Sequence, residues 1–225
     1  MSLDWDARDA DWRLVGGSDV AKLLGLSPYG NAADVYERVV LGVEHPTTPI
    51  QLRGQVLEPV LRGLLVAERP DWRRVTRADD YHAHPGLPLR AQVDDLFTAP
   101  DVTTRDGRLV VVDYKSVSRW AKGYGEAGTD EVPEHYLVQL AVEMLCADTR
   151  EAFLVCGFGD DDRKGGDFVL QRTATYRAMR DEALDAVIEN AVNKFWAEHV
   201  QPRRAPDMKP WRGKKPRAKK AVSNG

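Results

Sequence analysis

The sequence predicts an α/β protein in which helices flank one central mixed β-sheet. Apolar residues follow a helical period near the start of the chain, after its middle and towards its end. Apolar and alternating runs that indicate strands lie between these helical segments. The 225 residues are enough for one domain with a sizeable core, and a content of 43% hydrophobic and 30% charged residues is ordinary for a soluble globular protein.

Helices are expected first along the chain. In VGGSDVAKLLG, Ser18 is predicted to be the N-cap of a short helix. Asn31 is predicted to cap a second helix, which ends at Gly42. A third helix over 50–68 places its apolar residues on one face, and these are Leu57, Val60, Leu61, Leu64 and Leu65. Pro59 lies inside that run, so this helix is expected to start close to the proline or to bend there.

Strands dominate the middle of the chain. Three candidates are separated by the turn signals HPG and TTRDG. They cover roughly 73–83, 88–98 and 108–117. A helix over 133–147 follows a glycine-rich loop. The last predicted elements are strands over 151–157 and 167–172 and a long helix over 174–199.

Composition excludes several classes of protein. No apolar run approaches the roughly 18–20 residues that a membrane span requires, so no membrane partner is expected. The start, MSLDWDARDADW, is acidic and lacks the apolar core of a secretion signal. Cys146 and Cys156 are too few for a disulfide framework or for the four ligands of an iron–sulfur cluster. These features predict a cytoplasmic protein.

Charge divides the chain into residues 1–202, expected to form a single domain, and a flexible basic tail over 203–225. The tail holds nine of the 32 Lys and Arg residues and one of the 35 acids, so it carries +8 and the rest −11. Such a tail is either a nucleic-acid arm or a solubilising segment. The acidic body is compatible with binding DNA if some of its carboxylates converge on metal ions.

The segment LVVVDYKSV carries the most chemical information. Apolar residues on both of its faces predict a central, buried strand. Asp113 and Lys115 are two residues apart and therefore project to the same side. Buried charges must be paired or ligated, because burying one alone costs several kcal/mol. A structural ion pair and a reactive site both explain this pattern.

The preceding strand offers Asp94 and Asp95 in AQVDDLF, within a β pattern that disfavours aspartate. Adjacent residues point to opposite faces, so one of the two reaches the side of Asp113, and the choice stays open. Strands lie about 5 Å apart, which brings both carboxylates within reach of one or two Mg²⁺ or Mn²⁺ ions. Lys115 beside the metal could position or deprotonate a water and stabilise charge on phosphate. The predicted chemistry is phosphodiester hydrolysis.

Two acids followed by x-Lys across paired strands resemble the PD-(D/E)xK nuclease superfamily, and imply its restriction-endonuclease-like core. Six local segments, in the right order, are similar to the YqaJ-like viral recombinase, or lambda exonuclease, family of phages and prophages. They are VGGSDVAKLLGLSPYGNAADVYERVVLG at 15–42, RGQVLEPVL at 53–61, AQVDDLF at 91–97, VDYKS at 112–116, YLVQLAVEML at 136–145 and FWAEHVQPRRAPD at 195–207. The resemblance covers nearly the whole domain.

The resemblance implies roles for particular residues. The metal site would comprise Glu58, Asp94, Asp113 and the Tyr114 carbonyl, with Lys115 activating water and Gln139 orienting the site. Ser18 matches a serine that contacts the terminal DNA phosphate, and Arg8 or Arg13 would accompany it. This sequence departs from the family by having Asp95 at the glycine position of the usual S-P-D-G turn, and Asp113 where Glu is more usual.

Some of these residues also have ordinary explanations. Glu58 could be a solvated helix residue, although Gly54, one turn earlier, clears space beside it. Gln139 could be a polar residue at a helix edge, and Glu143 is expected to be a surface charge. Trp120 could stack on a base or belong to the core.

The family resemblance implies an exonuclease that digests one strand of linear double-stranded DNA from 5′ to 3′ during recombination, inside a bacterial host. It also implies a possible homotrimer and a single-strand annealing protein as partner. A restriction- or repair-type endonuclease is the alternative on the same core. A DNA-binding phage accessory protein without catalysis is the alternative of another class.

Overall fold

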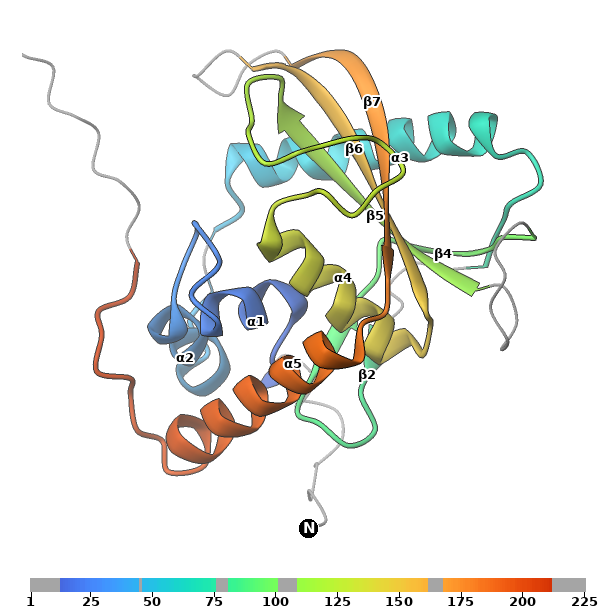
Figure 1. The fold of residues 1–225 in the computed structure, drawn as a ribbon. Helices are drawn as coiled ribbons and strands as arrows, with labels where there is room; N and C mark the ends of the chain where they lie inside the picture. The colour runs from blue at the N-terminus through green and yellow to red at the C-terminus, as the bar shows by residue number, and fades with distance from the viewer. Residues whose placement is uncertain (1–12, 45, 76–80, 101–108, 162–167, 212–225) are drawn as a thin grey trace, which may run out of the picture.

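The computed structural model describes residues 13–44, 46–75, 81–100, 109–161 and 168–211, and it confirms the α/β class (Figure 1). Five strands form a mixed sheet in the order β1-β4-β5-β6-β7. These strands are β1 (Arg73–Arg74), β4 (Asp95–Thr98), β5 (Leu109–Ser118), β6 (Glu151–Asp161) and β7 (Phe168–Met179). A separate pair consists of β2 (Tyr81–Ala83) and β3 (Arg90–Gln92).

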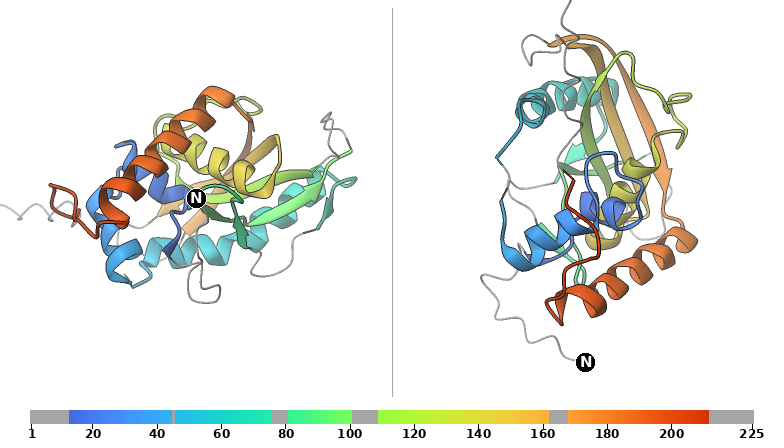
Figure 2. Two further views of the ribbon diagram at one scale, coloured as in Figure 1. Left: turned by 90° about the horizontal axis from the view of Figure 1, so that it is seen from below. Right: turned by 90° about the vertical axis from the view of Figure 1, so that its left-hand side faces the viewer.

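Helices cover both faces of the large sheet (Figure 2). One face packs against α1 (Gly17–Leu23), α4 (Glu134–Ala147) and α5 (Glu182–Phe195), with α2 (Ala32–Leu41) beside them. Among the helices that the structure describes, only α3 (Pro49–Glu68) packs against the other face. The predicted two-sided burial of β5 is confirmed, because Val111 lies in the first apolar cluster and Val110 and Val112 lie in the second.

β5 has one edge that is only half paired. β4 runs antiparallel to its first half, from Leu109 to Val112. β6 runs parallel to it on the other side, from Val111 to Ser118. Among the described residues, no strand continues β4 alongside the second half of β5. In this half of β5, Lys115, Ser116 and Ser118 are partly exposed, whereas Asp113, Tyr114 and Val117 are buried.

The helix caps follow the prediction at α2 but not at α1. Asn31 caps α2, and Gly42 ends it in the left-handed conformation at φ 69°. The prediction for Ser18 was wrong, because Gly16 is the N-cap residue and Ser18 lies exposed in the first turn. The carboxylate of Asp19, in the first turn, accepts the N–H of the N-cap residue Gly16 at 3.1 Å.

The third helix was only partly predicted. It begins at Pro49, because Thr48 accepts a backbone N–H of the first turn, and it continues through Pro59 to Glu68. Leu61 and Leu65 are buried as expected. The predicted inward position of Val60 and Leu64 was wrong, and Leu57 is only half-buried. A helix that covers a sheet face alone touches it along a narrow strip, so its outer side stays exposed and carries Leu52, Val56, Val60 and Leu64.

Two other boundaries differ from the prediction. The helix expected over 174–199 starts at Glu182, because β7 continues to Met179 and pairs along the whole of β6. Asp181 then caps α5 by accepting the Ala183 N–H at 2.8 Å. A π-helical turn, Trp196–Val200, follows α5.

The strands expected over 73–83 and 88–98 are each divided between the two sheets. In the first, β1 and β2 lie on either side of 76–80, which fall outside the described residues. In the second, β3 pairs with β2 and β4 pairs with β5, with Val93 and Asp94 at the crossing. The two halves of each predicted strand pair with different neighbouring strands, and the hydrophobic periodicity of the sequence alone does not reveal this.

The first residues of the expected tail, 203–211, contact helix α2. The Tyr36 hydroxyl donates to the Arg203 carbonyl at 2.7 Å, and the Trp211 N–H donates to Asp34 at 3.0 Å, so 203–211 lie against α2. Residues 212–225 fall outside the described part of the chain. None of the described helices is long and apolar enough to cross a membrane.

Candidate active site

Asp94 and Asp113 lie on the same face of neighbouring strands. The β4–β5 register pairs Asp95 with Val112, which places the preceding Asp94 beside Asp113. The Asp94 carboxylate accepts the Tyr114 N–H at 2.9 Å across the open edge of β5. Of the two acids that the sequence offered, Asp94 is therefore the one that approaches Asp113.

The Asp95 side chain lies on the opposite face of the sheet, towards α3. Its side chain is fully buried, forms ion pairs with Arg62 of α3 and Arg74 of β1, and accepts the Tyr114 hydroxyl at 2.9 Å. Every oxygen of this carboxylate is thus engaged by a protein donor. Asp95 fastens α3 to the sheet and has no free oxygen for a ligand.

Lys115 and Gln139 both hold Asp113. The Lys115 ammonium donates to Asp113 Oδ1 at 2.7 Å, and Gln139 Nε2 of α4 donates to the same oxygen at 2.9 Å. The ion pair that the sequence suggested is present. A purely structural pair would need no further acid beside it, yet Asp94 lies there as well.

Glu143 is the residue that sequence reasoning missed. It was expected at the surface, but it is 2% exposed and accepts a hydrogen bond from the same Gln139 nitrogen at 2.9 Å. Its second oxygen is buried without a hydrogen-bond partner among the described residues. The spacing of Gln139 and Glu143 by four residues, which places both on one face of the helix, was the available signal.

Glu58 reaches the site from the other side of the sheet. α3 packs on the opposite face, but its half-buried Glu58 interacts electrostatically with Asp94 and Lys115. Burial and Asp94 raise the pKa of Glu58, and Lys115 opposes them. A Cβ atom on Gly54 would meet nothing within 4 Å, which leaves open space one turn away. We infer that Glu58 approaches around the half-paired edge of β5.

Asp94, Asp113, Lys115, Gln139 and Glu143 form one cluster, and in it negative charge exceeds positive charge. Burial and the neighbouring Asp113 raise the pKa of Asp94 to about 7. Burial also raises the pKa of Asp113 and that of Glu143. The pKa of Lys115 is raised despite its burial, because Asp113, Asp94 and Glu143 favour the ammonium form. A bound cation would relieve this imbalance.

The residues fit a hydrated divalent cation. In the described ranges, no three carboxylate, imidazole or thiol groups form a ready cage for a metal. Mg²⁺ does not need one, since it binds through one or two carboxylates and keeps several waters. Asp94 and Asp113 supply two carboxylates. The Tyr114 carbonyl leaves the strand on the same side as its N–H, which faces Asp94.

The raised pKa of Asp94 predicts a pH-dependent stability. The folded protein keeps a proton on Asp94 up to about pH 7, whereas the ordinary pKa of an aspartate in the unfolded chain is 3.8. The resulting stabilisation is present below about pH 4 and is lost as the pH rises through about 7. Without divalent cations, we expect Asp94→Asn to be more stable than the wild type at about pH 8, by on the order of 2 kcal/mol.

Thermal unfolding in EDTA between about pH 5 and pH 9 measures this difference. Asparagine still offers an oxygen to the Tyr114 N–H, so the comparison isolates the charge. If stability changes with pH in the same way in the two proteins over the whole range, the pKa of Asp94 is not raised in the folded state.

The residues expected at the DNA phosphate and at a base lie near the cluster or at the surface. Ser18 is exposed on α1, and α1 begins beside the site, because a Cβ on Gly17 would lie 3.2 Å from the Gln139 side chain. Arg13 is exposed, and Arg8 lies outside the described residues. Trp120 is 74% exposed, so it is not part of the core.

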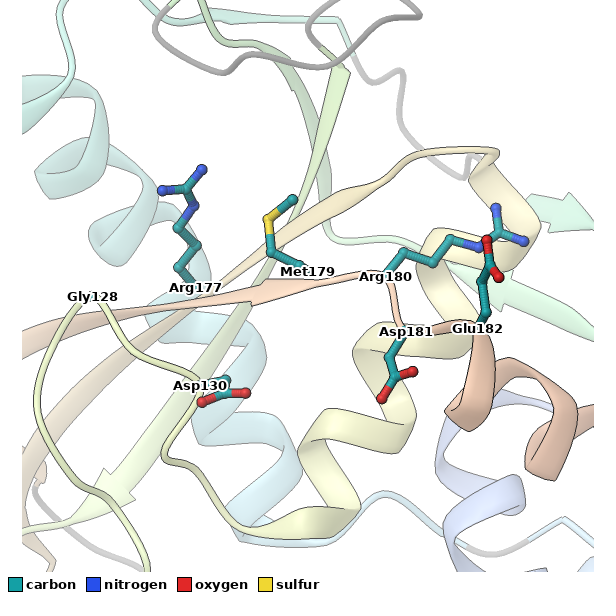
Figure 3. A pocket seen from close by; sticks show the side chains of 7 residues that line it. All are labelled: Gly128, Asp130, Arg177, Met179, Arg180, Asp181 and Glu182. Carbon is teal, nitrogen blue, oxygen red and sulfur yellow. The ribbon is translucent and has the colours of Figure 1, made fainter.

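A surface hollow of about 850 Å³ lies elsewhere, beside the end of β7 (Figure 3). None of the cluster residues lines it. Its arginines are engaged in ion pairs, Arg177 with Glu151 and Arg180 with Asp185. In Figure 3, Arg177 points to one side of the strand and Asp181 to the other, so these groups do not converge on a ligand.

Comparison with known proteins identifies a family. The model of the YqaJ-like viral recombinase domain matches residues 6–150. The alkaline exonuclease LHK-Exo from Laribacter hongkongensis is similar in structure, and its complex with dAMP gives a TM-score of 0.59 at 19% identity, covering 86% of this chain and 91% of that one. A phage-related exonuclease from Haemophilus somnus 129PT gives 0.57 at 15% identity, covering 84% and 96%. No curated protein matches.

Proposed function

Because the chain belongs to the YqaJ-like viral recombinase family, we propose that it is a DNA exonuclease that hydrolyses phosphodiester bonds with the help of a divalent cation. The observation that supports this most is the cluster in which Asp94 and Asp113 share one face with Lys115. A site that only stabilised the fold would balance its charges, as Asp95 does with Arg62 and Arg74.

Each residue of the cluster has a proposed task. Asp94, Asp113 and the Tyr114 carbonyl would hold Mg²⁺ or Mn²⁺, with Glu58 facing the same edge. The ion supplies a Lewis acid and a more acidic coordinated water. Lys115 presents a protonated ammonium where charge develops on the phosphate. Gln139 keeps the Asp113 carboxylate in one orientation by donating to Oδ1.

The proposed substrate is the end of linear double-stranded DNA, digested from 5′ to 3′ during recombination. Ser18, with Arg13 or Arg8, would contact the terminal phosphate. The dAMP in the LHK-Exo complex is a nucleoside monophosphate, the kind of product that an exonuclease releases. A homotrimer and a single-strand annealing protein are the partners that the family suggests.

Duplexes labelled at either the 5′ or the 3′ end test this proposal. With Mg²⁺, we expect the 5′ label to be released first as a mononucleotide, and EDTA to stop the release. A closed circle of the same sequence is the control and should stay intact. Cutting of the circle would indicate an endonuclease instead. Protein that binds the duplex but leaves every substrate whole would support the non-catalytic accessory alternative.

A further inference from the structure

A row of aromatic rings leads from the site to an exposed tyrosine. The Lys115 ammonium lies 5.7 Å from the centre of the Tyr136 ring. Tyr136 is 4.1 Å from the ring of His135, and His135 is 6.0 Å from the ring of Tyr29. Each step is short, so Tyr29 lies only a few nucleotides' length from the ammonium that would face the cut phosphate.

The inner end of this row packs against the hydrophobic core. Tyr124 packs beside Tyr136 at 6.4 Å and meets Phe158 of β6 edge to face at 5.2 Å. The side chains of Tyr124 and Tyr136 also share a hydrogen bond. Rings fixed by the core in this way lose little freedom when a ligand binds, which favours affinity.

The outer end of this row, at Tyr29, is exposed. Tyr29 is 64% exposed and lies between α1 and α2, where its N–H donates to Ser27 Oγ at 3.2 Å. Its ring meets His135 almost at right angles, at 81°, and has no other ring neighbour among those the structure describes. An edge contact of this kind leaves aromatic surface uncovered, which contributes little to folding.

His135 suits an uncharged aromatic ligand. Burial and the charge of Lys115 lower its pKa, which favours the neutral imidazole. Its Nε2 is buried without a hydrogen-bond partner among the described residues. Tyr29 therefore presents an exposed, uncharged aromatic face, and the His135 ring packs against it almost at right angles.

We propose that Tyr29 and His135 form a subsite for a nucleobase of the strand being cut, in which the base stacks on Tyr29. This inference rests on the proposed nuclease function. Every base has a flat aromatic face, so such a subsite would bind an unpaired base of any sequence. It would hold the strand in line with the cluster, and it would add a contact to the base where Ser18 is proposed to contact a phosphate.

Binding to single-stranded oligonucleotides in EDTA tests the subsite without requiring cleavage. We expect Tyr29→Ala to weaken binding roughly tenfold, Tyr29→Phe to leave it near the wild-type value, and Tyr29→Leu to resemble the alanine variant. Tyr81→Ala is the matched control, because Tyr81 is also half exposed but lies on β2 beside Arg90. Fluorescence anisotropy gives the affinities.

Abasic positions identify the stacking itself. A single abasic nucleotide is placed in turn at each of about five positions from the 5′ end. At one position, we expect the wild type to lose affinity to the level of Tyr29→Ala, and the two proteins to bind equally. The proposal is overturned if Tyr29→Ala binds like the wild type, or if its loss persists with every abasic oligonucleotide. If the wild type cleaves no DNA but the binding results are as expected, the proposed nuclease function is wrong and this subsite still stands.

Discussion

Asp113→Asn is expected to slow DNA cleavage by roughly a thousandfold, the upper range for removing one electrostatic group from a catalytic site. The substitution keeps the size of the side chain but removes the negative charge of the carboxylate to which both Lys115 and Gln139 donate hydrogen bonds. It also removes one of the two carboxylates proposed to hold the cation. Single-turnover rates on linear duplex with Mg²⁺ measure the effect.

Binding of duplex in EDTA should not be weakened in this variant, because the lost charge repels DNA rather than attracting it. Asp160→Asn is the matched control, since Asp160 lies on β6 and forms a partly exposed ion pair with Arg119. We expect its cleavage rate to stay within about twofold of the wild type. An Asp113→Asn protein that cuts nearly as fast as the wild type would remove this cluster from the mechanism.

Asp95→Asn is expected to lower the free energy of unfolding by about 2–4 kcal/mol, a typical loss when one partner of a buried ion pair is removed. Asp95 is fully buried, and it joins Arg62, Arg74 and the Tyr114 hydroxyl. Asparagine has neither the charge nor the acceptors to satisfy all three donors. Both arginines are partly exposed, so water can solvate them in the variant and keeps the loss moderate.

Urea denaturation gives this value, and cleavage measured well below the unfolding midpoint gives the activity of the folded fraction. We expect that activity to be retained. Asp94→Asn is the complementary variant, with the same substitution one residue earlier, and it should lose activity while remaining folded. A stable but inactive Asp95→Asn protein would mean that the two acids have exchanged the roles assigned to them.

The central strand could be predicted because its pattern is local. Alternation in LVVVDYKSV fixes which residues share a face, and Asp113 and Lys115 do lie together. The strand pattern left the choice between Asp94 and Asp95 open, and only the family resemblance favoured Asp94, since the choice depends on the pairing of β4 with β5 and on Arg62 from a distant helix. The residues flanking the two acids carry no trace of those contacts.

Burial was harder to predict than secondary structure. Glu143 is charged, so it was assigned to the surface, and only the packing of α4 against the sheet encloses it. Val60 and Leu64 are apolar, so they were assigned to the interior, although α3 has a sheet on one side only. The start of α5 was missed because β7 extends as far as its partner strand β6 does.

The crossing between the small and the large sheet at Val93 and Asp94 limits how the chain length can vary. A single inserted or deleted residue would rotate each following side chain to the opposite face. After one insertion, the acid that belongs with Lys115 would take the position that faces Arg62, and its neighbour would move to the position of Leu96, opposite Val111. Exchanging the 81–93 hairpin between related proteins should therefore succeed only when both hairpins place the same number of residues before this pair of acids.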